Sequence, residues 1–200
     1  MNILIPGGAG YIGARLVPKL LADGHHVTVV DTMWFGNGCL PGDNDHLVKI
    51  KHDLRDPYEI FKKQDALIML ASISSDAMCQ KYPELARDVN VKSARRMVES
   101  ARAAGVKRII YASSVAAYGS IERDAVETDA LMPTTIYGQH KKEAEEAIRA
   151  EYSSAIIVRS ASVCGYSPRQ RFDITVNMMV HDAVRKGVIT VNGGEQKRSH

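Results

Sequence analysis

The sequence predicts an α/β fold: a doubly wound parallel sheet with helices on both faces, and a smaller C-terminal part. Short runs rich in aliphatic and β-branched residues alternate with amphipathic helical stretches along the chain. A glycine-rich turn, Gly7–Gly13, follows the first of these runs and opens the first helical stretch. No internal repeat or low-complexity linker interrupts the alternation.

The apolar runs predict the strands of the sheet. Each is short, bounded by polar or turn residues, and too short for a helix. The predicted strands are Asn2–Ile5, His26–Val30, Leu47–Ile50, Ala66–Leu70, Arg108–Ala112 and Ala155–Arg159.

Helices are predicted between these strands. In the first, over Tyr11–Ala22, apolar residues share one face, and Pro18 predicts a local kink. A long second helix is predicted over Pro83–Ala104, with proline in its first turn and Gly105 just past its end. A third should run from near Thr135 to about Tyr152.

The C-terminal end has a different pattern. Val188–Val191 is predicted to be a strand, and Asn192–Gly194 a turn, after which the sequence stops without a closing element. We therefore expect residues 1–165 to form the main domain, and residues 166–200 to begin a second domain of a longer protein.

Composition excludes several classes of protein. The formal net charge of +3 is small for 200 residues, and the basic residues form short pairs, so no nucleic-acid partner is expected. No apolar run approaches the roughly 18 residues that span a bilayer, so no membrane partner is expected. Three scattered cysteines have no metal-ligand spacing. We expect a soluble, cytoplasmic protein with free thiols and no metal site.

The glycine-rich turn predicts a dinucleotide site. A pyrophosphate needs backbone N–H donors at close range, which glycine permits because it has no Cβ. Gly8, Gly10 and Gly13 also fit the G-x-G-x-x-G template, in the strand–turn–helix context that it requires. The predicted phosphate-side residues are Gly7, Gly10, Tyr11, Ile12 and Gly13.

Two carboxylates follow the next strands. Asp31 lies 18 residues after Gly13. A carboxylate at this position accepts hydrogen bonds from the adenosine ribose hydroxyls and would repel a 2′-phosphate. No arginine follows it closely, so NAD is favoured over NADP. Asp53 is placed for the adenine amino group, or alternatively for capping a following helix.

Tyr137 and Lys141 lie four residues apart, and on a helix they would share a face. The ammonium is expected to stabilise the phenolate and lower the tyrosine pKa, so that the tyrosine, as phenolate, can take a proton from an alcohol. Ser113 and Ser114 follow a central strand, at the edge of the sheet where sites form in open α/β folds.

These motifs together resemble the extended short-chain dehydrogenases/reductases, in the NAD-dependent sugar epimerase/dehydratase group that UDP-galactose 4-epimerase typifies. The resemblance covers essentially the whole chain and implies a Rossmann domain. The segments that carry it are Gly7–Gly13, Leu67–Ala71, Asn90–Val91, Ala112–Gly119, Tyr137–Lys141 and Arg159–Gly165.

The resemblance implies the roles of the site residues. Ser114 would hold the substrate oxygen, Tyr137 would be the acid/base, and Lys141 would bind the nicotinamide ribose while tuning the tyrosine. The stretch Arg159–Val163 would line the cofactor, and Asn90 would be either structural or on the cofactor side. Further cofactor-lining residues would be Leu54, Leu70, Ala71, Ser72 and Ser113.

The resemblance further implies a nucleotide diphosphate sugar as substrate. Asn177 would contact the diphosphate and Arg198 would clamp it, although a helix-end polar residue and a surface charge are the alternatives. The family also implies a homodimer through the long helix and the Tyr137 helix. An apolar stripe suits such contacts, or else faces the sheet: Ala94, Met97, Val98 and Ala101.

A 4-epimerase is the favoured activity. The 4,6-dehydratases of the family carry Thr-Asp-Glu where this chain has Ser114-Val115-Ala116, so dehydration loses its acid pair. A one-way dehydrogenase or 4-ketoreductase is the alternative, but reductases more often prefer NADPH, against which Asp31 argues. A non-catalytic NAD-binding sensor or scaffold is disfavoured because serine, tyrosine and lysine are all present.

Overall fold

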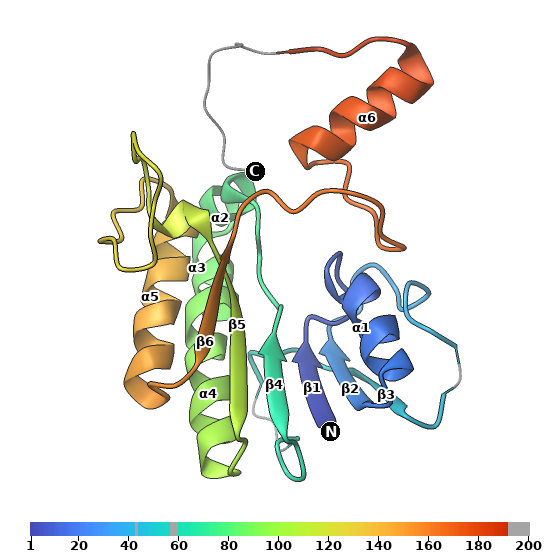
Figure 1. Ribbon diagram of the computed structural model, residues 1–200, viewed down its shortest axis with the longest axis vertical. Coiled ribbons are helices and arrows are strands. Elements are labelled where there is room, and N and C mark those ends of the chain that lie inside the picture. Colours follow the sequence, from blue (N-terminus) through green and yellow to red (C-terminus); the bar gives the residue numbers. More distant parts are fainter. Residues whose placement is uncertain (43, 57–59, 192–200) are drawn as a thin grey trace.

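Parallel strands form one sheet in the order β3-β2-β1-β4-β5-β6 (Figure 1). The structure is a computed structural model that describes residues 1–42, 44–56 and 60–191. The predicted fold class is confirmed, and each predicted strand matches an observed one to within two residues. The strands are β1 (Asn2–Pro6), β2 (His26–Asp31), β3 (Leu47–Lys51), β4 (Ala66–Met69), β5 (Arg108–Ser114) and β6 (Ile156–Ser160).

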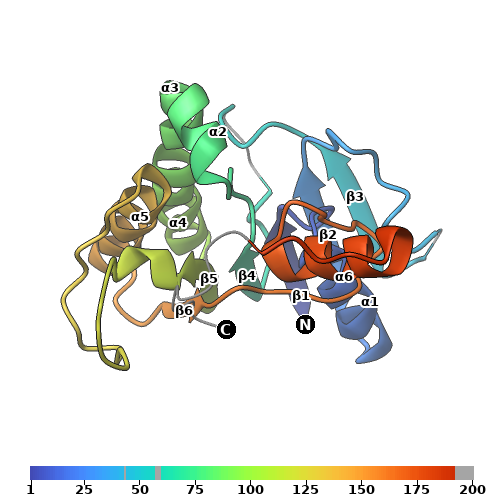
Figure 2. The same cartoon turned by 90° about the horizontal axis from the view of Figure 1, so that it is seen from above.

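Helices cover both faces of this sheet. On one face α4 (Ser93–Ala103) and α5 (Ile136–Glu151) bury a core that includes Leu4. On the other, α1 (Gly13–Ala22) packs over neighbouring β1 residues, because successive side chains of a strand point to opposite faces (Figure 2). The strand order reverses between β1 and β4, which is where ligands bind in open α/β sheets.

The apolar stripe of α4 faces the sheet. Ala94, Met97, Val98 and Ala101 are all buried in the core beside Leu67. The stripe is therefore explained by packing within one chain, and it gives no support to the predicted dimer.

The long predicted helix over Pro83–Ala104 is confirmed as one uninterrupted helical run, but it is not α-helical throughout. It consists of α3 (Pro83–Arg87), a π-helical turn (η1, Asp88–Lys92) and α4. The Ser93 hydroxyl donates to the Asp88 carbonyl at 2.9 Å across this turn. The wider turn places Asn90 in the interior, and such π-turns are frequent at functional sites.

The remaining elements include both confirmed and unforeseen ones. Helix α5 begins where predicted, because the Thr135 hydroxyl accepts a hydrogen bond from the Gly138 N–H at 3.0 Å. Helix α1 continues through Pro18. Three elements of the described chain were not predicted: the short helix α2 (Asp76–Lys81), the 3₁₀ turn η2 (Val115–Ala117) and the longer helix α6 (Thr175–Lys186).

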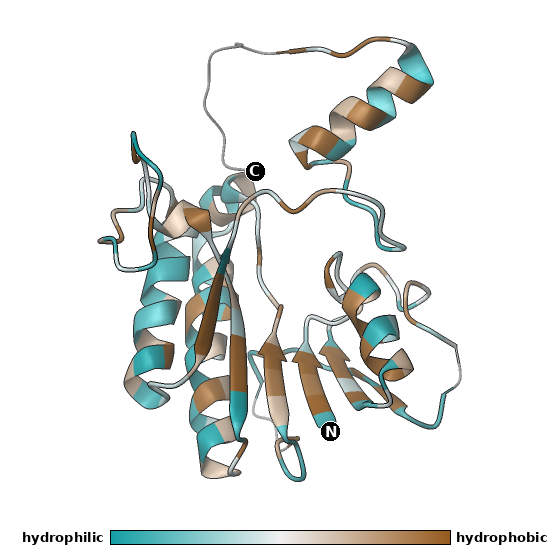
Figure 3. Ribbon diagram, in the orientation of Figure 1, coloured by the Kyte–Doolittle hydropathy of each residue, from teal (hydrophilic) through white to brown (hydrophobic). Residues whose placement is uncertain are grey.

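The described C-terminal segment, residues 166–191, lies beyond the carboxyl ends of the strands (Figure 1). The predicted strand Val188–Val191 was wrong: these residues have no regular secondary structure and pair with no strand of the described sheet, and their apolar side chains are exposed. The strands consist largely of hydrophobic residues (Figure 3). On the edge strand β6, however, Ile156 and Val158 are exposed. The predicted turn Asn192–Gly194 lies outside the described residues.

Candidate active site

The β1–α1 turn packs so tightly that glycine is required at two positions. Gly7 has a φ of +79°, and a Cβ built there would lie 2.4 Å from the Ala71 nitrogen, just after β4. A Cβ on Gly13 would lie 2.2 Å from the Gly8 carbonyl oxygen. The turn therefore brings bare backbone and the N-terminus of α1 to the switch point, as pyrophosphate binding requires.

A cavity of about 170 Å³ lies against this turn. Two aromatic residues that the sequence analysis did not single out, Trp34 and Phe35, form part of its wall. Apolar walls with a few polar groups are typical of cofactor sites, so the residues present fit NAD. Of the predicted cofactor residues, the cavity is lined by Gly7, Gly10, Asp31, Asp53, Leu54, Leu70, Ala71 and Ser72.

The two acidic residues of this cavity are held differently. Asp31 accepts the N–H of Ala9 at 3.1 Å and that of Met33 at 2.9 Å, so its carboxylate is fixed beside the glycine turn. Asp53 pairs with Arg55, whose Nη2 lies 2.7 Å from its Oδ2. The hydrogen bonds from Arg55 lower the pKa of Asp53. No helix follows directly among the described residues 53–56, so the capping alternative for Asp53 has no support.

The predicted serine, tyrosine and lysine come together where α5 crosses the carboxyl end of β5. The Lys141 ammonium donates to the Ala112 carbonyl at 2.7 Å and lies 5.5 Å from the centre of the Tyr137 ring. Ser114 accepts the Ala116 N–H at 3.2 Å, and its hydroxyl also interacts with the Tyr137 phenol. The arrangement places an alcohol-binding hydroxyl, a phenol and a cation in one cluster.

Burial controls the titration of this cluster. It raises the pKa of Tyr137 to about 12, although the hydroxyls of Ser72 and Ser114 act in the opposite direction. The expected lowering of the tyrosine pKa was therefore wrong, because desolvation of the phenolate outweighs its stabilisation. Burial also lowers the pKa of Lys141 to about 7, against the opposing charge of Glu145.

The lowered pKa of Lys141 predicts how stability depends on pH. Between pH 7 and 10 the unfolded chain holds a proton on this lysine that the folded chain has lost, so the free energy of unfolding should rise with pH. The contribution is at most about 1.4 kcal/mol per pH unit. Above pH 10 the raised pKa of Tyr137 should reverse the trend.

Denaturant unfolding from pH 6 to 11 measures this dependence. Lys141→Met should flatten the rise, whereas Lys142→Met, which removes a surface contact to the Leu131 carbonyl, should leave it in place. An equal slope in Lys141→Met and the parent protein would contradict the assignment.

Several side chains predicted to line the cofactor make internal contacts instead. Asn90 is 2% exposed; its Oδ1 accepts from Ser72 and the Ile73 N–H, and its Nδ2 donates to the Ile73 carbonyl. Of its two alternatives, the structural role therefore has the support of the structure. The Ser113 hydroxyl donates to the Glu145 carboxylate, and Arg159 pairs with the same group. Neither side chain is directed at the cavity.

Asn177 and Tyr11 join the C-terminal segment to the glycine turn. Asn177 is 6% exposed, accepts the Gly165 N–H at 2.8 Å, and donates to the Tyr11 hydroxyl at 3.1 Å and the Arg171 carbonyl at 2.9 Å. The Tyr11 hydroxyl in turn donates to the Gly165 carbonyl at 2.6 Å. Asn177 is thus a buried residue in the first turn of α6, so the helix-end alternative for it keeps the support of the structure. Arg198 lies outside the described residues.

Other candidate sites are weaker. A cavity of about 240 Å³ between the sheet and α4 has mainly apolar walls. Its lining residues include Asp56 and Ile60, between which the chain is not described, so we assign it no function. Within the described ranges no group of three or more His, Cys, Asp or Glu side chains could hold a metal ion. None of the helices described is long and apolar enough to cross a membrane.

Taken together, the glycine cradle, the Asp31 carboxylate and the Ser114–Tyr137–Lys141 cluster are the features of a dinucleotide-binding fold of the doubly wound class. The sequence profile of the NAD dependent epimerase/dehydratase family matches residues 3–200. The chain belongs to this family, as the sequence motifs predicted, and NAD is its cofactor.

Named relatives are consistent with this assignment. The chain is 33% identical over 169 residues to UDP-glucose 4-epimerase 4 of Oryza sativa subsp. japonica, with 76% of this chain and 45% of the relative covered. It is 31% identical over 188 residues to a putative UDP-arabinose 4-epimerase 2 of Arabidopsis thaliana, covering 85% and 45%. The chain therefore spans about half the length of these relatives.

Solved structures share the fold. A UDP-N-acetylglucosamine 4-epimerase from Methanobrevibacter ruminantium M1 superposes with a TM-score of 0.85 at 25% identity, covering 93% of this chain and 63% of that one. MoeE5 in complex with UDP-glucuronic acid and NAD gives a TM-score of 0.80 at 28% identity, covering 91% and 61%.

Proposed function

We propose that the protein is an NAD-dependent nucleotide-sugar 4-epimerase. The observation that carries the proposal is the cluster of Ser114, Tyr137 and Lys141 at the carboxyl end of β5, where alcohol chemistry can be performed beside the cofactor cavity. Residues 1–165 would form the NAD-binding domain, and residues 166–200 would begin the domain that binds the nucleotide sugar. Relatives named as UDP-sugar 4-epimerases support this choice.

The geometry supports a division of roles. Ser114 would hydrogen-bond the C4 hydroxyl of the sugar, and Tyr137 would take its proton and later return it. Lys141 would stabilise the phenolate form of Tyr137, which accepts this proton and is restored when the proton is returned. NAD, when bound, supplies a reversible hydride acceptor. Because burial raises the pKa of Tyr137 to about 12, loss of the proton from its own phenol depends on a neighbouring positive charge.

Substrate binding would involve the C-terminal segment. We propose that Asn177 contacts the diphosphate, which would require it to exchange one of its present partners, and that Arg198 clamps the same group. Arg171 also lies in this region. Its positive charge acts to lower the pKa of Tyr137, and its Nη1 donates to the Ser74 hydroxyl at 2.7 Å.

The function is tested with the full-length protein, NAD, and a panel of UDP-, GDP-, CDP- and dTDP-sugars followed by proton NMR. A C4 epimer without net NADH is expected. A keto product with stoichiometric NADH would show a one-way dehydrogenase instead. NAD binding without turnover of any sugar would indicate a sensor or scaffold.

We also propose that the protein is cytoplasmic and forms a homodimer through the outer faces of α4 and α5. Three free cysteines suit a reducing compartment: Cys39, Cys79 and Cys164. Light scattering after size-exclusion chromatography measures the assembly directly, and the mass of one chain would contradict the dimer.

A further inference from the structure

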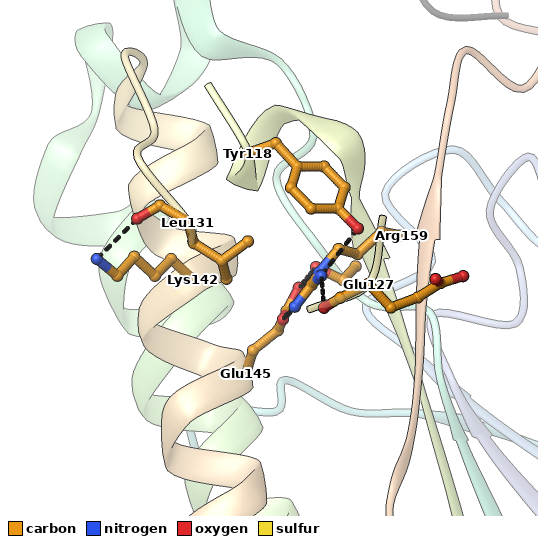
Figure 4. A network of polar contacts seen from close by, with 7 residues as sticks. Tyr118, Glu127, Leu131, Lys142, Glu145 and Arg159 are labelled. Carbon is orange, nitrogen blue, oxygen red and sulfur yellow. Dashed lines mark hydrogen bonds and ion pairs between the residues drawn. The ribbon is translucent and has the colours of Figure 1, made fainter. Parts of the chain in front are cut away.

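A buried ion pair lies directly behind the catalytic cluster. Glu145 on α5 is 1% exposed. The Arg159 guanidinium from β6 donates two hydrogen bonds to its Oε2, from Nη2 at 2.7 Å and from Nε at 3.1 Å (Figure 4). The hydrogen bonds that Arg159 donates to the Glu145 carboxylate raise the pKa of Arg159 above its ordinary value. The pair lies in a region from which water is largely excluded.

Sheet register explains why these groups meet. Ser113 of β5 and Arg159 of β6 are paired residues in the parallel sheet, so their side chains lie side by side on one face. Glu145 comes down onto them from α5, which covers that face, and the Ser113 hydroxyl donates to its Oε1. One carboxylate thus joins β5, β6 and α5.

The network also extends outward from the sheet. Arg159 Nη1 donates to the Tyr118 hydroxyl at 2.9 Å and to the Glu127 carbonyl at 3.0 Å (Figure 4). Its guanidinium carbon lies 4.7 Å from the centre of the Tyr118 ring. Each of the three guanidinium nitrogens donates at least one hydrogen bond, so the position of the arginine, and of the carboxylate it holds, is fixed.

Glu145 is connected to the catalytic cluster through adjacent residues. It lies four residues after Lys141 on α5, so the two buried side chains share a face of the helix. Lys141 donates to the Ala112 carbonyl, and the very next residue of β5, Ser113, donates to Glu145. Ser114 follows immediately, at the end of the strand.

A buried ion pair needs a reason, because an apolar pair of similar volume is often as stable. We propose that Glu145 is a positioning residue: it provides the counter-charge of the Lys141 ammonium and, through Ser113 and Arg159, fixes the strand end that presents Ser114. The catalytic part of this proposal rests on the proposed function, whereas the charge coupling does not.

The groups that face Lys141 come from each element around it. Tyr111 of β5 presents its ring 4.7 Å from the ammonium, Tyr137 lies on the same helix, and Cys79 comes from α2. Both tyrosines are neutral near pH 7, since burial raises their pKa values, and the Cys79 thiol pKa is raised as well. Glu145 is therefore the carboxylate that offsets the cost of burying this ammonium.

The test measures the Lys141 titration directly. NMR of the protein with ¹³C-labelled lysine follows the ε-methylene signal with pH, and the signal is assigned from its loss in Lys141→Met. Glu145→Gln should lower the Lys141 pKa by about one unit or more. Glu146→Gln, which changes an exposed neighbour on the same helix, should leave it in place. An unchanged Lys141 titration in Glu145→Gln would overturn the proposal.

A second variant keeps the test informative if Glu145→Gln does not fold, since it leaves Arg159 buried without its partner. The double variant Glu145→Gln/Arg159→Met removes the pair as a unit and should also lower the Lys141 pKa. Where the sugar substrate is known, the pH profile of kcat should shift to lower pH in either variant. A uniform loss of kcat with an unshifted profile and titration would show a purely structural role. Absence of any turnover in the parent protein would instead count against the proposed function, not against the charge coupling.

Discussion

Tyr137→Phe is expected to lower turnover by at least about a hundredfold, because phenylalanine cannot accept or return the proton of the sugar hydroxyl. The side chain keeps its ring, so packing around it should persist. NAD affinity should change by no more than roughly twofold, since removing a proton-transfer group does not alter binding in the ground state. Steady-state kinetics on the identified sugar, with a separate NAD titration, measure both effects.

Tyr152→Phe is the matched control for this change. Tyr152 directly follows the C-terminal end of α5, far along that helix from Tyr137. Its hydroxyl shares its proton between the Lys107 and Val106 carbonyls, which precede β5, whereas Ser114 ends that strand. Turnover should therefore survive that substitution. Unchanged turnover in Tyr137→Phe would remove the phenol from the reaction and leave the acid/base role to another group.

The strands were predictable because each is a short aliphatic run, and burial on both faces of a parallel sheet demands such runs. The start of α5 was predictable because Thr135 is a local cap. The π-turn at Asp88–Lys92 was not predictable, because it lies within a helical sequence pattern and does not interrupt that pattern. The end Val188–Val191 has the composition of a strand, but composition does not supply the partner that a strand needs.

The site divides in the same way. The glycine turn, Asp31 and the tyrosine–lysine pair are local motifs, and the structure brings them to one edge of the sheet. Glu145 was missed although it lies on the same helical face as Lys141, because a glutamate in a helix is usually a surface residue. Its burial follows from the register of β5 against β6, which the sequence does not specify.

Ser113 illustrates the limit further. The sequence correctly places it at the end of β5, yet a strand sends consecutive side chains to opposite faces. Ser113 therefore meets Glu145, whereas Ser114 meets Tyr137. Two adjacent serines at one strand end thus have different partners, and the choice between them depends on which face α5 covers.

Gly7→Ala should have a large effect on the cofactor site. Alanine at this positive φ costs about 1–2 kcal/mol by itself. The added methyl group would also lie 2.4 Å from the Ala71 nitrogen, so the β1–α1 turn must move away from β4. We expect the total loss of stability to exceed about 4 kcal/mol, the range of an exceptional single substitution. Denaturant unfolding measures the loss, and an NAD titration should show strongly weakened binding.

Gly24→Ala separates the two causes, because Gly24 has nearly the same φ, +78° against +79°, and a methyl group added there would meet no described atom within 4 Å. That variant should lose only about the 1–2 kcal/mol of the backbone term and keep its NAD affinity. If both variants lost the same amount and both still bound NAD, contact between the turn and Ala71 would not matter. The difference between them therefore measures how far the cofactor cradle depends on backbone packed directly against backbone.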